Sequence, residues 1–251
     1  MKRHVASLCA AVLAASASLA SARDTGWLSD ENFTGNIAYT SDYVFRGVSQ
    51  TNSSWAVQGG IDYAAPAGVY AGTWASNVSF GGGIEMDFYG GFASEVAGVT
   101  YDLGVIYYAY PKSHDDPELN FVEGTFKLGY ELPPLGSAVP SLGITYAYSP
   151  NFYGEDGAAH YVAGALDLSL PWGLSLSGDV GWQRVEGDKT TGEGQGLEGD
   201  DGFDYVHYRL GVASSFKGFD LDVSYHNTTE ADFLGSDIAD GRLVFTVSRS
   251  L

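Results

Sequence analysis

The sequence predicts an all-β fold: a transmembrane antiparallel up-and-down β-barrel of about 12 strands. Three observations support this fold. Apolar and polar side chains alternate with a period of two, as they do on a strand. The links between the predicted strands are mostly short at one end and long at the other. The chain also ends on an amphipathic strand with an apolar last residue, Leu251.

Alternation is clearest near residue 60, where Trp55, Val57 and Ile61 share one face and Gln58 and Asp62 share the other. Counting such segments gives twelve predicted strands, each about ten residues long, which is the length of a tilted membrane-spanning strand. They are expected near residues 35–46, 54–64, 68–77, 84–95, 99–110, 120–130, 141–149, 159–170, 174–184, 205–216, 219–227 and 241–251.

The links after even-numbered strands are mostly short, as at 65–67 and 217–218, although 132–140 is longer. The links after odd-numbered strands are mostly longer and polar, as at 185–204. This asymmetry is typical of an outer-membrane barrel with both termini on the periplasmic side. The alternative is a soluble sandwich or lipocalin-like barrel, in which the aromatic side chains would form a core instead of two interfacial rings.

The N-terminal segment is predicted to lie outside the fold. Residues 1–22 have a basic start, an apolar stretch and small residues at the end, as a secretory signal peptide does. The alternatives are a buried helix or a membrane anchor. Residues 23–34 are then a periplasmic segment and residues 35–251 the barrel. The expected location is the outer membrane of a Gram-negative bacterium.

The charge balance excludes one large class of partner. The chain has 12 Lys and Arg against 31 Asp and Glu, a formal charge of −19. Nucleic acid is bound through Lys and Arg, so we expect no nucleic-acid partner. The content of hydrophobic residues, 45%, and of aromatic residues, 14%, argues against a disordered acidic chain.

Residues 41–50 read Ser-Asp-Tyr-x-Phe-Arg-Gly-x-Ser-Gln and resemble the opening motif of the TorF family of porins. Further matching pieces are 68–77, 85–91 and 102–111, so the resemblance spans most of the chain after residue 22. It implies an outer-membrane β-barrel that forms a pore. It implies no known substrate and no catalytic residue.

Strand alternation predicts the side chains that line the lumen. Ten acids face four bases, which predicts a cation preference because rings of carboxylates favour cations. The alternative is that these charges pair across strands and fill the lumen. Asp42 and Arg46 would lie about 13 Å apart along the first strand and pair with neighbouring strands. The full set is Asp42, Arg46, Asp62, Glu85, Asp87, Asp102, Glu123, Lys127, Asp167, Asp179, Arg209, Asp220, Asp222 and Arg242.

No catalytic, cofactor or metal site is predicted. Asp222, Ser224 and His226 share one strand face, but their side chains should point in parallel about 7 Å apart. The acids of 185–204 are expected in a solvated outer loop, with Ca²⁺ binding as the alternative.

The function expected from these features is a narrow passive channel for ions or small polar solutes. The alternatives are a non-conducting structural or surface-interaction barrel, a lipid-modifying enzyme, and a soluble periplasmic protein. The expected partners are outer-membrane lipid, small ions or solutes, and the barrel-assembly machinery, which would recognise the C-terminal strand. The oligomeric state is left open.

Overall fold

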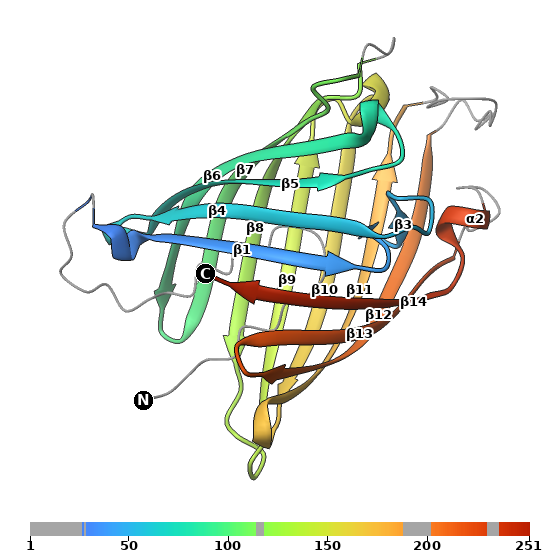
Figure 1. Cartoon of the computed structure of the whole chain (residues 1–251). Coiled ribbons are helices and arrows are strands. Elements are labelled where there is room, and N and C mark those ends of the chain that lie inside the picture. The colour runs from blue at the N-terminus through green and yellow to red at the C-terminus, as the bar shows by residue number, and fades with distance from the viewer. Residues whose placement is uncertain (1–26, 28, 114–117, 188–201, 230–235) are drawn as a thin grey trace.

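The fold of the computed structural model is a closed antiparallel barrel of twelve strands (Figure 1). The structure describes residues 27, 29–113, 118–187, 202–229 and 236–251, so the predicted signal peptide and most of the acidic 185–204 loop lie outside the described residues. Pairing of β1 with both β4 and β14 closes the barrel. The predicted fold is confirmed. The barrel strands are β1 (Phe33–Thr40), β4 (Ala56–Ala64), β5 (Val69–Asn77), β6 (Ile84–Val96), β7 (Val99–Ala109), β8 (Phe121–Glu131), β9 (Val139–Ser149), β10 (Ala159–Ser169), β11 (Leu174–Val185), β12 (Phe203–Phe216), β13 (Phe219–Thr228) and β14 (Arg242–Ser250).

The two faces of the wall differ in chemistry, as β9 illustrates. Leu142, Ile144 and Tyr146 are exposed on the outside, while Ala147 and Ser149 are buried on the inside. The period-two pattern of the sequence produces this division, because successive side chains of a strand point to opposite faces. The outer surface of the barrel is therefore apolar.

The links keep the predicted asymmetry. Short turns at 97–98 and 217–218 occupy one end of the barrel, together with the C-terminus. In both turns the two central residues have positive φ, 53° and 82° at Ala97 and Gly98, which suits the twist of a tight hairpin. The links at 41–55, 78–83 and 150–158, and the described parts 110–113 and 118–120 of a fourth link, lie at the other end (Figure 1).

Helical structure is minor. The helix α2 (Ser236–Ala239) precedes β14, and short 3-10 turns occupy several links. Within the described ranges, no helix is both long enough and apolar enough to cross a membrane.

The predicted first strand, 35–46, is wrong in its second half. β1 ends at Thr40, and the chain then turns into the barrel and forms a small hairpin from β2 (Val44–Phe45) and β3 (Val48–Ser49). We call residues 41–54 the inner hairpin. The apolar and aromatic residues 43–45 suit a strand, so the pattern alone resembles one uninterrupted strand.

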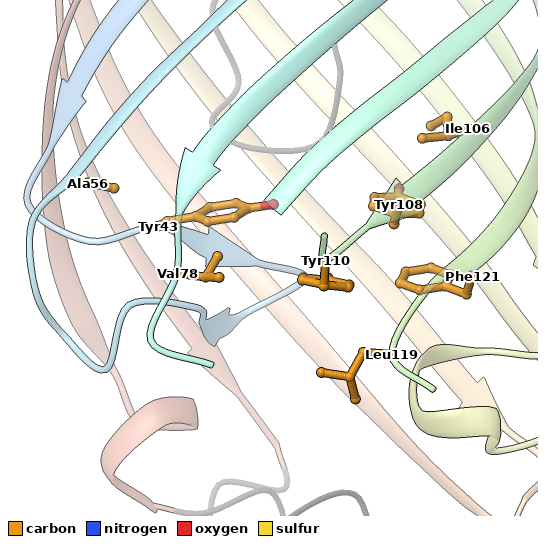
Figure 2. Packing of buried hydrophobic residues seen from close by; sticks show 8 residues of the cluster. All are labelled: Tyr43, Ala56, Val78, Ile106, Tyr108, Tyr110, Leu119 and Phe121. Carbon is orange, nitrogen blue, oxygen red and sulfur yellow. The ribbon is translucent and has the colours of Figure 1, made fainter. Parts of the chain in front are cut away.

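Buried aromatic side chains fill part of the barrel interior near the long links (Figure 2). Tyr108 and Phe121 stack with ring centroids 4.3 Å apart, and Tyr43 from the inner hairpin packs edge-on against Trp74 at 5.4 Å. This packing holds the inner hairpin against the wall formed by β5 to β8. The buried cluster consists of Tyr43, Ala56, Val78, Ile106, Tyr108, Tyr110, Leu119 and Phe121.

Candidate functional site in the barrel interior

The base of the inner hairpin is fixed by Asp42. One carboxylate oxygen, Oδ1, accepts hydrogen bonds from the hydroxyls of Ser49 and Thr51 at 2.6 and 2.7 Å. The other, Oδ2, lies 3.0 Å from Nη1 of Arg242 on β14. Asp42 thus closes the hairpin on itself and ties it to the wall.

The tip of the hairpin is a two-residue turn formed by Arg46 and Gly47, whose φ angles are 48° and 85°. Positive φ at both positions defines the type I′ turn that two-residue hairpins favour. Arginine rarely adopts this conformation, so its side-chain contacts have to hold it there.

Arg46 makes those contacts with β8, β10 and β11, which lie in one arc of the wall. Its Nη1 and Nη2 donate to Oε1 and Oε2 of Glu123 on β8 at 3.0 and 2.7 Å. Nη1 also donates to Oε1 of Gln183 on β11 at 2.6 Å, and the guanidinium lies 4.0 Å above the ring of Tyr161 on β10. Burial alone would lower the pKa of Arg46, but the facing Glu123 carboxylate raises it above its ordinary value. The arginine therefore remains charged.

Gly47 brings the tip against the next strands of the wall, β12 and β13. A Cβ atom at Gly47 would lie 2.6 Å from Cγ2 of Thr228 on β13 and 2.7 Å from Cβ of His207 on β12. Together with the Arg46 contacts, this means that the inner hairpin crosses the interior from β1 to strands on the far side of the barrel.

The wall beside the hairpin carries a carboxylate cluster, which we define as Glu85, Asp87 and Glu123. The two oxygens of Glu85 accept from the hydroxyls of Tyr43 and Tyr110, both at 2.6 Å. Burial, followed by the charge of Glu85, raises the pKa of Tyr43 well above its ordinary value. Tyr43 therefore stays a hydrogen-bond donor near neutral pH.

The remaining predicted residues lie toward the short-turn end and are mostly half-buried. Asp62 accepts from Tyr89, and Asp102 accepts from Tyr70 at 3.0 Å. Arg209 pairs with Asp222 at 2.9 Å.

Strand alternation puts twelve of the fourteen predicted side chains on the inner face of the wall. The other two, Asp42 and Arg46, belong to the inner hairpin and not to a wall strand, which corrects the predicted 13 Å separation along the first strand. That this set lines a pore stays a prediction. Tyr43, Gln183 and Tyr161 also hold the hairpin and were not among the predicted residues. The local feature of the sequence that indicates the hairpin is the Arg46-Gly47 pair between apolar residues.

The predicted parallel arrangement of Ser224 and His226 is wrong. The Ser224 hydroxyl lies 3.1 Å from Nε2 of His226. However, Oδ2 of Asp222 on the same strand is held by Arg209, and Ser224 is only 1% exposed. The three residues therefore do not form an acid–base relay that a substrate could reach. The described residues also contain no group of three or more His, Cys, Asp and Glu arranged to hold a metal ion.

A family model described as "Bacterial protein of unknown function (Gcw_chp)" matches residues 25–251. The chain belongs to this family. No curated protein matches the sequence of this Gcw_chp member.

Solved structures resemble this Gcw_chp barrel in fold. A "KdgM porin" superposes with a TM-score of 0.52 at 6% identity, covering 86% of this chain and 97% of the porin. A "NanC porin structure in rhombohedral crystal form" gives 0.53 at 6% identity with the same coverage. A third structure, the "KdgM porin in complex with disordered oligogalacturonate", gives 0.52 at 5% identity with the same coverage again. The Gcw_chp chain therefore has the fold of outer-membrane porins.

Proposed function

We propose that this protein is a narrow, cation-preferring channel for ions or small polar solutes in the bacterial outer membrane. The observation that carries the proposal is the excess of carboxylates inside a closed barrel whose outer surface is apolar. Nine acids and three bases of the predicted set lie on the inner face of the wall, and Asp42 and Arg46 lie on the inner hairpin. A cleft lined by one sign of charge concentrates ions of the opposite sign.

The charge also bears on the kind of solute. One of the similar porin structures is a complex with oligogalacturonate, which is a polyanion. The acidic interior of this chain would repel such a chain of carboxylates, so we propose that small cations pass in preference to acidic sugars.

The location is part of the proposal. A closed barrel satisfies the backbone hydrogen bonds of all its strands, which is what a membrane requires of a spanning sheet. We propose that the long links face the outside of the cell and that outer-membrane lipid surrounds the wall. We also propose that the barrel-assembly machinery recognises β14. The resemblance of 41–50 to the TorF family of porins supports the same assignment.

Planar-bilayer recording of the purified, refolded protein tests this function. In a tenfold KCl gradient, a cation-preferring channel gives a zero-current potential with the sign set by K⁺. A potential with the sign set by Cl⁻ would overturn the cation preference. Detergent without protein serves as the control for leakage.

A second candidate function is favoured by the inner hairpin. Because the hairpin crosses the interior and its tip is buried, the barrel could act without conducting, as a structural or surface-interaction protein. Protein that shows the heat-modifiable gel mobility of a folded barrel but gives no conductance steps would support this candidate over the channel.

A further inference from the structure

The carboxylate cluster brings three carboxyl groups together, and one cation in the described part of the chain is in contact with it. Glu85 and Asp87 lie on β6, and Glu123 lies across β7 on β8. Among the described residues, the cation that contacts the cluster is Arg46, which binds Glu123 through both of its terminal nitrogens. Within the cluster, this guanidinium forms its ion pair with Glu123.

The three carboxyl groups differ in how well they are satisfied. Glu85 accepts from two tyrosines, and Glu123 accepts from Arg46 and from Tyr108 at 3.1 Å. Asp87 is only 2% exposed, and its Oδ1 has no hydrogen-bond partner among the described residues. A buried carboxylate oxygen without a donor is costly, so nearly all such atoms in proteins have a partner.

We propose that the carboxylate cluster is a cation-binding site and that Arg46 is its built-in occupant. Carboxylate oxygens bind a guanidinium through paired hydrogen bonds. When the inner hairpin moves away, Glu123 loses its partner and joins Asp87 in binding a small cation from solution. The role of this site in permeation rests on the proposed channel function, because a permeant cation would compete with Arg46 for the same oxygens.

Chemical replacement of the arginine tests the site without relying on conductance. Purified R46A is titrated with guanidinium chloride up to tens of millimolar, against NaCl at matched ionic strength, and its thermal unfolding is followed. Guanidinium should raise the Tm by about 3–5 °C once it reaches about ten times its dissociation constant. A general denaturing effect of the salt would lower the Tm instead.

Two controls make the test specific. Wild type, whose site is occupied, should show no rise in Tm. R242A should also show none, because it loses the ion pair at the base of the hairpin but keeps Arg46 in the cluster. If R46A does not give the heat-modifiable folded form, R46Q replaces it in the same titration.

The double variant R46A/D87N tests the role of Asp87. The proposed site uses the Asp87 carboxylate as a ligand, so its replacement by asparagine should weaken guanidinium binding at least about tenfold. Absence of a guanidinium-specific rise in R46A, or unchanged affinity in R46A/D87N, would overturn the inference. Conductance of wild type is measured separately. Guanidinium binding without conductance would contradict only the proposed channel function. Conductance without guanidinium binding would contradict only the proposed cation site.

Discussion

Arg46 and Glu123 form a two-pronged ion pair inside the barrel, with Nη2 2.7 Å from Oε2, although they lie 77 positions apart in the sequence. Both side chains are almost completely buried. The net contribution of such a pair to stability is small, because desolvating two charges offsets most of their attraction. Its effect on structure is specific: the pair, together with Gln183, determines where the tip of the inner hairpin lies.

Removing one partner of this pair should destabilise the barrel much more than removing both. In R46M, Glu123 remains as an uncompensated buried charge, so we expect a loss of about 3–5 kcal/mol in the free energy of unfolding. In E123L, Arg46 is the uncompensated buried charge, so we expect a similar loss. The double variant R46M/E123L should lose far less than the sum of the two. Denaturant titrations of the four proteins, read by heat-modifiable mobility, give the coupling energy, and additive losses would contradict the structure.

Gly47 should tolerate no side chain, and the chain supplies a matched control for this prediction. Gly47 and Gly218 have nearly the same φ, 85° and 84°, so alanine is strained at both by about 1 kcal/mol. At Gly218 nothing lies within 4 Å of the added Cβ, whereas at Gly47 it meets Thr228 and His207. G47A should therefore lose about 1–3 kcal/mol more than G218A. Equal losses in denaturant titrations would mean that the tip does not pack against β12 and β13.

The wall of the barrel could be predicted from the sequence because its physics is local. Side chains alternate along each strand, and turn residues such as Lys217 and Gly218 separate one strand from the next. Nearly every strand therefore lies within a few residues of its predicted bounds, and the inner faces follow from the same alternation.

The inner hairpin could not be predicted, because its determinants are distant in sequence. Val44 and Val48 fit a continuing strand as well as they fit a hairpin. What turns the chain inward is the pairing of Asp42 with Arg242 on the last strand and of Arg46 with Glu123 on β8. Neither partner can be identified before the barrel is closed. The contact between Ser224 and His226 was missed for a simpler reason: Cα spacing along a strand sets no lower limit on the approach of two bent side chains.

The proposed cation preference predicts different effects for two aspartates on adjacent strands. Asp179 of β11 faces inward, whereas Asp204 of β12 lies on the outer face beside Trp182 and Arg184. Removing a unit charge about 10 Å from an ion in water changes its energy by about 0.4 kcal/mol, a roughly twofold change in local concentration. The same change acts with the opposite sign on Cl⁻, so D179N should lower the K⁺ to Cl⁻ permeability ratio about fourfold, and D204N should leave it unchanged. An equal effect of both variants on the zero-current potential would contradict an acidic permeation path.

Whether the apolar outer face lies in a bilayer can be tested with one substitution on the wall and one at its edge. Ile144, in the middle of β9, is 57% exposed, and Trp172, in the short turn before β11, is 96% exposed. In water, replacing either exposed side chain by arginine changes stability by only about 0.5 kcal/mol. In a bilayer, I144R should cost about 2–4 kcal/mol at mid-membrane, whereas W172R at the interface should cost about 0–1. Unfolding is measured in lipid vesicles and in detergent-free buffer. Equal stability of I144R and W172R in vesicles would mean that this face does not contact lipid, and the closed, apolar-walled barrel would then have to serve a function outside the membrane.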